Sequence, residues 1–235
     1  MNENVARPRC GRWIRYSLVI AATLSVLTFL AWWGYERYSA IQYFEDRGGQ
    51  VVTEPLRPAL LNDVVVATFG NKLTDVTTVS MQDTGVGDAA VENLVGLTRP
   101  EFAATERLNL ENTNVTDASL VHLTGLKKLT RLVLENTGVT DTGLSHVSKL
   151  TSLHGLNLEE TDVTDAGLPK LENLSLLQEL SLNNTRVSDD GLPYLWIHTG
   201  LTSLDLRNTD VTESGVAELK LRLPNCKVLH STSNP

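Results

Sequence analysis

The stretch "LVLENTGVTDTGL", from Leu132 to Leu144, decides the fold because the chain repeats it. The near-copies "LNLEETDVTDAGL" (156–168) and "LSLNNTRVSDDGL" (180–192) follow at steps of 24 residues. A fixed period of this length indicates a chain wound into stacked, similar coils. The first leucine of the pattern recurs in five units, as Leu108, Leu132, Leu156, Leu180 and Leu204.

A more divergent copy precedes these five units. In "VSMQDTGVGDAAVENLVGL" the apolar, threonine and acidic positions of the pattern are kept, with five extra residues before the next unit. The repeat domain is therefore expected to span residues 76–230, with about six units of the 24-residue type. The matching residues are Val79, Met81, Thr84, Val86 and Asp88.

The leucines at alternate positions predict a short strand with one buried face. Alternate residues of a strand point to the same side, so both leucines of each L-x-L segment enter the core, where each contributes roughly 1.5–3 kcal/mol. One coil cannot cover its own apolar face and must stack on a neighbour. The threonine after each strand is expected to turn the chain inward, and its hydroxyl to bridge backbone groups of adjacent coils. These threonines are Thr113, Thr137, Thr161, Thr185 and Thr209.

The segment "VTDAGL" predicts the start of a helical return in each coil. Thr116, Thr140, Thr164, Ser188 and Thr212 are suited to cap these helices, and an acid follows each of them in the first turn. Neighbouring acids are expected about 4.8 Å apart, where they repel by about 0.9 kcal/mol in water. A helix N-terminus returns about 0.3–1 kcal/mol per acid, so we expect these acids to act mainly in capping. A calcium-binding ladder is the alternative.

The pattern L-x-L-x-x-T-x-V-[TS]-D-x-G-L-x-x-L resembles the leucine-rich repeat family over residues 76–230. The "GGQV" and "LPNC" segments also resemble bacterial membrane-anchored members. The resemblance implies an α/β, right-handed solenoid with a parallel sheet on the concave side and short helices on the convex side. It also implies that the concave face binds partner proteins. One departure is threonine at the position where the family has asparagine or cysteine.

The N-terminal region predicts a membrane anchor. Residues 17–33 carry no charge and would rise about 25 Å as a helix. Arginines precede this run and tryptophans close it, which favours a signal anchor over 17–35 with a cytoplasmic tail over 1–16. A cleaved signal peptide is the alternative, although bulky Trp and Tyr stand where small residues are expected. The repeat domain would then lie outside the cytoplasm, at a bacterial inner membrane.

Two further segments flank the repeats. Residues 36–75 are expected to form a juxtamembrane connector and an N-terminal cap, with a short strand at "QVV" and prolines beyond it. Residues 231–235 form a tail.

Composition and motifs argue against several functions. The 235 residues carry a formal net charge of −8, which disfavours nucleic-acid binding. No catalytic or phosphate-binding motif is present, and two cysteines form no zinc site, so we expect neither an enzyme nor a cofactor or metal site. Cys226 is expected to be a buried small hydrophobe.

The outward side chains of the strands are the candidate partner-binding residues, and Glu111, Glu135 and Glu159 form an acidic stripe among them. Their charges could instead serve only to keep the sheet soluble. In "YLWIHTGL", His198 stands where earlier units have leucine. Trp196 is expected to fill the missing leucine's space, or else to form with Ile197 an exposed apolar contact. The candidates are Arg107, Asn109, Glu111, Arg131, Glu135, Asn157, Glu159, Glu179, Asp205 and Arg207.

These features predict a non-catalytic, membrane-tethered module that contacts the lipid bilayer through residues 17–35 and binds an extracytoplasmic protein through its concave face. A structural or adhesive envelope protein without a discrete partner is one alternative. A ligand-sensing ectodomain is another.

Overall fold

The computed structural model describes residues 42, 45–54, 75–93 and 105–231. The expected membrane helix over 17–35 lies outside these residues, as does most of the expected cap. Within the described ranges, no helix has the length and apolar character needed to span a bilayer.

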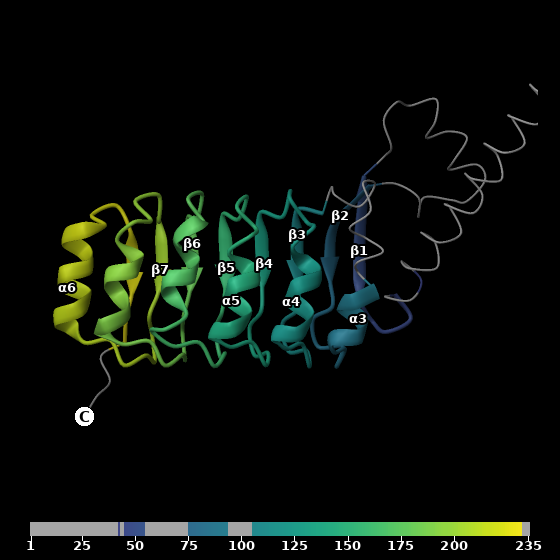
Figure 1. The fold of residues 1–235 in the computed structure, drawn as a ribbon, viewed down its shortest axis with the longest axis horizontal. Coiled ribbons are helices and arrows are strands. Elements are labelled where there is room, and N and C mark those ends of the chain that lie inside the picture. Colours follow the sequence, from purple (N-terminus) through teal and green to yellow (C-terminus); the bar gives the residue numbers. More distant parts are fainter. Residues whose placement is uncertain (1–41, 43–44, 55–74, 94–104, 232–235) are drawn as a thin grey trace, which may run out of the picture.

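The strands form one sheet of eight, in which sequence order is also spatial order (Figure 1). β2 to β8 run parallel, while β1, which contains the expected "QVV" strand, pairs antiparallel with β2 at the N-terminal edge. Equivalent residues face one another, as where Leu132 lies between Leu108 and Leu156, so one 24-residue unit makes one coil. The strands are β1 (Gln50–Glu54), β2 (Asp75–Ser80), β3 (Arg107–Asn109), β4 (Arg131–Val133), β5 (Gly155–Asn157), β6 (Glu179–Ser181), β7 (Ser203–Asp205) and β8 (Lys227–Leu229).

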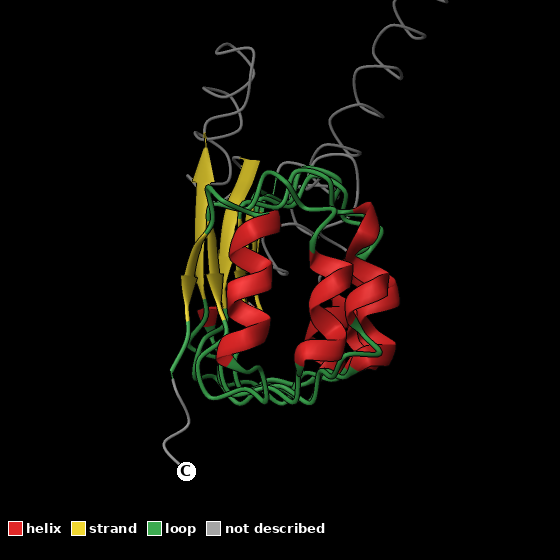
Figure 2. Ribbon diagram, turned by 90° about the vertical axis from the view of Figure 1, so that its left-hand side faces the viewer, coloured by secondary structure: helices red, strands yellow, loops and turns green. Residues whose placement is uncertain are grey.

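The helical segments make a second layer on one face of the sheet (Figure 2). Two of them, η3 and η4, are 3₁₀ helices, whereas the sequence predicted only short helices without this distinction. Pro193 lies inside η4 and lacks the backbone N–H that an α-helix would use for an i→i−4 bond, whereas Pro169 lies in the first turn of η3, where no such bond is needed. The segments are α3 (Asp88–Asn93), α4 (Asp117–Leu123), α5 (Asp141–Val147), η3 (Leu168–Asn173), η4 (Asp189–Leu195) and α6 (Glu213–Arg222).

The core lies between the two layers and consists mainly of leucine. Both leucines of every L-x-L segment are buried, as predicted, and so are the valines that follow each turn. Cys226 is buried, with 8% of its surface exposed, which confirms its predicted role as a small hydrophobe. Because every coil presents the same apolar face to the next, the core is one continuous column.

Each coil turns at a residue of positive φ just before the repeated threonine. The threonine hydroxyl then donates to a carbonyl three residues earlier in its own coil, as from Thr137 to Leu134 at 2.6 Å. The expected bridge between adjacent coils is therefore wrong for these hydroxyls, because backbone bonds such as Leu134 N–H to Asn157 O already join the coils. The positive-φ residues are Asp83, Asn112, Asn136, Glu160, Asn184 and Asn208.

The repeated acids also have a role that differs from the predicted one. The threonine or serine caps form as expected, since Thr140 Oγ1 accepts a bond from the backbone of Thr142. The preceding coil's Asp117, however, turns toward Thr140 and accepts its N–H at 2.8 Å and its hydroxyl at 2.6 Å. Asp88, Asp141, Asp165 and Asp189 do the same with the caps of their next coils.

These contacts make the acids joints between coils. A glycine in the following coil leaves the space they need: a Cβ on Gly143, Gly167, Gly191 or Gly215 would meet the preceding coil's aspartate closer than any real Cβ contact. Both oxygens of each joining carboxylate accept hydrogen bonds from protein groups, so each negative charge has donors within the solenoid itself.

Candidate interaction surface

The candidate residues on the strands share one surface, here named the outer sheet face. It consists of the side chains of β3 to β7 that alternate with the buried leucines, together with the second residue after each strand. The strands are in register, so equivalent side chains form straight columns across the coils. The face is turned away from the helical layer (Figure 2).

One column carries the acidic stripe. Glu111, Glu135 and Glu159 occupy equivalent positions in three adjacent coils, and Asn183 and Arg207 continue the column. Burial raises the pKa of Glu135, and the negative charges of Glu159 and Glu111 raise it further, while a hydrogen bond from Asn157 opposes the shift. The ion pairs found among the described residues involve none of the three glutamates. The stripe is therefore a set of close negative charges that form no ion pair within the described residues, although the charge of Arg207 acts on Glu159 from the next position but one in the column.

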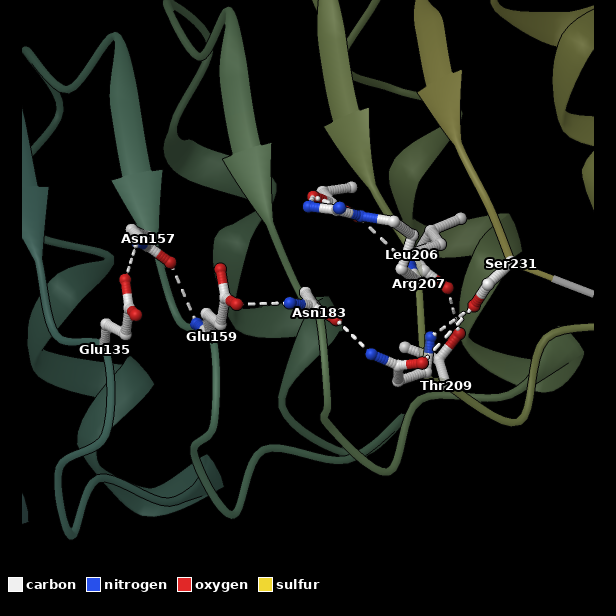
Figure 3. Close-up of polar contacts among 10 residues, drawn as sticks. Glu135, Asn157, Glu159, Asn183, Leu206, Arg207, Thr209 and Ser231 are labelled. Atoms are coloured by element: carbon white, nitrogen blue, oxygen red, sulfur yellow. Dashed lines mark hydrogen bonds and ion pairs between the residues drawn. The ribbon is translucent and has the colours of Figure 1, made fainter. Parts of the chain in front are cut away.

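A chain of hydrogen bonds holds two of the three stripe residues, Glu135 and Glu159 (Figure 3). Asn157 Nδ2 donates to Glu135 at 2.9 Å, and the side-chain oxygen Oδ1 of Asn157 accepts the backbone N–H of Glu159 at 2.9 Å. Asn183 then donates to Glu159, and Asn208 donates to Asn183 at 3.0 Å. These side chains lose little further freedom when a partner docks, because they are already ordered.

Sequence reasoning missed this short-range bonding, although its signal is visible. An Asn or Asp two residues before the stripe position accepts the backbone N–H of the stripe residue in three coils, at Asn109, Asn157 and Asp205. This local bond orients the stripe residue, and it is absent where Val133 and Ser181 take the position.

A second column holds the basic candidates. Arg107 is exposed on β3, and Arg131 forms an ion pair with Glu179 at 2.7 Å, two strands away. The Arg131 side chain crosses the intervening strand at Gly155, where a Cβ would lie 3.4 Å from the guanidinium carbon. Both partners remain about half exposed, so the pair contributes little stability but fixes the position of both charges.

Asp205 and Arg207 are paired with each other. The Arg207 guanidinium donates to both carboxylate oxygens of Asp205, at 2.5 to 3.1 Å, and Asp205 is only 9% exposed. Burial on its own would raise the pKa of Asp205, but the hydrogen bonds and charge of Arg207 outweigh it and lower that pKa. Arg207 therefore covers Asp205, and the aspartate offers a partner little free charge.

A shallow hollow of about 210 Å³ lies between these pairs on the outer sheet face. Its lining includes Gly155, Ser181 and Ser203, whose small side chains leave space between the Arg131–Glu179 pair and Asp205. The Ser181 hydroxyl oxygen is buried there without a hydrogen-bond partner. The small outward residues in three successive coils are the sequence signal that could have indicated it.

Trp196 and Ile197 lie in the helical layer at the end of η4, not with the other candidates. His198 itself is buried and holds the leucine position, so the prediction that Trp196 fills that space is wrong. Trp196 instead packs half-buried against the outside of the core, with the Arg222 guanidinium 4.6 Å from its ring centre. Ile197 is 62% exposed, as the alternative expectation of an apolar contact requires.

Coils of 24 residues, each with one short parallel strand and one helical segment around a leucine column, define a leucine-rich repeat solenoid. No known family model matches the sequence, and no curated protein is significantly similar to it. Among solved structures, the chain is similar to a leucine-rich repeat protein of Leptospira interrogans, with 19% identity over 58% of this chain and 33% of that one, and a TM-score of 0.46. The chain thus spans about a third of the Leptospira protein's length.

Two proteins of Listeria monocytogenes are also similar. Internalin C2 has 22% identity over 74% of this chain and 93% of its own, with a TM-score of 0.42. Internalin F has 19% identity over 60% of this chain and 51% of its own, with a TM-score of 0.37. At these identities and scores the likeness says nothing about what this chain binds.

Proposed function

We propose that this chain is a non-catalytic, membrane-tethered leucine-rich repeat protein that binds an extracytoplasmic protein through its outer sheet face. The observation that supports this most is the acidic stripe: three glutamates in adjacent coils whose carboxylates accept bonds from Gln82, Asn157 and Asn183 and form no ion pair within the described residues. A stripe that served only solubility would need neither fixed side chains nor a shared position.

The stripe favours a partner that presents lysine or arginine side chains. The energetic cost of holding Glu135 ionised beside Glu111 and Glu159 is relieved when a cation approaches. Such complementarity speeds association and weakens with salt, because exposed charges are screened over about 8 Å at physiological ionic strength. The hollow beside Gly155 offers room for one side chain of the same partner.

The tether is proposed from the sequence of residues 17–35, with the repeat domain outside the cytoplasm. Proteolysis of spheroplasts that carry the full-length chain tests this topology. Added protease should degrade the repeat domain while it leaves a cytoplasmic control protein intact. A repeat domain protected until the membrane is permeabilised would contradict the proposal.

Site-specific photo-crosslinking in native membranes tests the binding face. A p-benzoylphenylalanine probe at Val133, on the outer sheet face of β4, is compared with a probe at Val121, which is exposed on α4 in the helical layer. The Val133 probe should yield a discrete crosslinked protein that the Val121 probe does not. Raising the salt concentration should lower the yield.

A triple Glu111/Glu135/Glu159→Gln variant is the matched test of the stripe. Glutamine keeps an oxygen that can accept the bonds from Asn157 and Asn183 but removes the charge. The Val133 crosslink should be lost in this variant while its circular dichroism spectrum is unchanged. If the crosslink survives in this variant, the stripe charges serve only to keep the sheet soluble. If the wild type gives no crosslink, a structural role without a discrete partner is favoured.

A further inference from the structure

A histidine lies in the leucine core of the C-terminal coils. His198 stands at a position that Leu126, Leu150 and Leu174 hold in the preceding units, and only 3% of its surface is exposed. It lies just after η4, which packs between η3 and α6. A side chain that can gain a charge therefore occupies a site built for an apolar one.

The surroundings of His198 favour the neutral ring. Its Nε2 atom is buried without a hydrogen-bond partner. Burial lowers the pKa of His198 below its usual range, and a hydrogen bond with the backbone carbonyl of Leu174 offsets this only in part. Protonation would add an N–H at Nε2 that has neither a protein acceptor nor access to water.

No carboxylate on the packed elements is placed to compensate that charge. Within η4, Asp189 is bonded to Thr212, and Asp190 is exposed. On η3, Lys170 donates to the carbonyl of Asp141, and Glu172 is exposed.

On α6, Glu218 lies 4.0 Å from Arg222, which covers Trp196, while Glu213 and Lys220 are exposed. Cys226, just beyond α6, is buried, and this burial raises the pKa of its thiol, which stays uncharged. Accordingly, only two causes act on the pKa of His198: burial, which lowers it, and the hydrogen bond with the Leu174 carbonyl, which raises it.

We propose that His198 is an acid-sensitive latch: its protonation opens the C-terminal coils, from η4 to β8, while the preceding coils stay closed. The opening is local because coils contact only their neighbours and those near a solenoid end have fewer contacts to lose. β7 carries Asp205 of the outer sheet face, so acid would also release a bound partner if the proposed function holds. The latch itself does not depend on that function.

The direction in which pH shifts the opening of these coils follows from proton linkage. In the open state His198 regains an ordinary pKa near 6.5, so acid protonates the open state first and stabilises it. At pH 5.5 the opening equilibrium constant rises by up to about tenfold over its value at pH 7.5. Glu135 acts in the opposite sense, because its raised pKa makes the closed state bind protons more readily.

Amide hydrogen exchange of the full-length chain in detergent, followed by mass spectrometry at pH 7.5 and 5.5, tests the latch. Once corrected for intrinsic exchange, rates over 189–231 should rise up to about tenfold at pH 5.5 relative to those over 131–160. The His198→Leu variant, which restores the residue of the other units, should lose this rise. The His230→Gln variant should keep this rise, because His230 Nε2 already has a hydrogen-bond partner, the Val211 carbonyl at 2.9 Å.

Equal acid responses in the wild type and His198→Leu would overturn the proposal, as would a wild type whose two regions respond alike. A second measurement covers the case in which His198→Leu does not fold. The pKa of the His198 ring, followed by NMR in the wild-type chain, should lie below 6.5. A value at or above 6.5 would remove the basis of the latch.

Discussion

Replacing Gly191 by alanine should destabilise the solenoid, although alanine is intrinsically the better helix former by up to about 1 kcal/mol. The reason is the preceding coil's aspartate. A Cβ at position 191 would overlap Asp165 Oδ1 and lie 2.8 Å from a methyl carbon of Leu168. The carboxylate must move, and it then loses its bonds to the N–H and hydroxyl of Ser188, at 2.8 and 2.6 Å.

The size of the effect follows from those two bonds. A hydrogen bond to a charged group contributes about 1.5–3 kcal/mol, and partial exposure of the joint favours the lower end. We therefore expect Gly191→Ala to lower the free energy of unfolding by about 3 kcal/mol, and Asp165→Ala to do the same. Because both remove the same bonds, the double variant should lose about 3–4 kcal/mol rather than about 6.

Urea denaturation followed by far-UV circular dichroism measures all three variants. Gly200→Ala is the matched control, since its nearest neighbour would be the Leu177 carbonyl oxygen at an ordinary 3.6 Å, and its effect should stay within about 0.5 kcal/mol. Strictly additive single effects, or a stabilising Gly191→Ala, would refute the joint.

Three further changes have expected signs. Glu160→Asn should raise the free energy of unfolding by about 0.5–1 kcal/mol in urea, because Glu160 has a φ of 55° that asparagine tolerates better. Glu135→Gln should raise the free energy of unfolding at pH 7, because the raised pKa shows that ionised Glu135 destabilises the native state. The variant should also show a flatter pH dependence of stability, because wild-type stability grows as pH falls through that raised pKa. Arg207→Ala should raise the pKa of Asp205, measured by carboxyl NMR, because the guanidinium bonds and charge that oppose burial are lost and only the backbone N–H of residue 207 still lowers it. The ionised Asp205 stabilises the wild type above its unfolded pKa, and this contribution is lost on acidification; in the same variant it should shrink.

The period of 24 residues was enough to predict the coil, the buried leucines and the in-register strands. These depend on alternation within a strand and on the need of each coil for a neighbour, and both are visible in a single unit such as 132–144. The outward positions of the ten candidate residues follow from the same alternation, so the outer sheet face could be read from the sequence.

The partners of the polar side chains could not be predicted in this way. Asp117 and Thr140 lie 23 residues apart, and their contact depends on the step between coils rather than on the pattern within one. The preference for acids at helix starts therefore predicted that each aspartate stabilises its own helix. In the structure the aspartate instead bonds to the next coil. The Arg131–Glu179 pair spans two coils for the same reason, and it needs the absence of a side chain at Gly155.

The joints give each coil two chemically different sides. A coil offers carboxylate oxygens such as those of Asp141 toward the C-terminus and a hydroxyl with its N–H, as at Thr140, toward the N-terminus. Loss or duplication of one whole coil leaves every donor opposite an acceptor, and the Asp88–Thr116 joint keeps this match although five extra residues lie between its two coils. The solenoid can therefore lengthen or shorten in units of one coil, which makes the width of its outer sheet face a property that evolution can adjust without redesigning the fold.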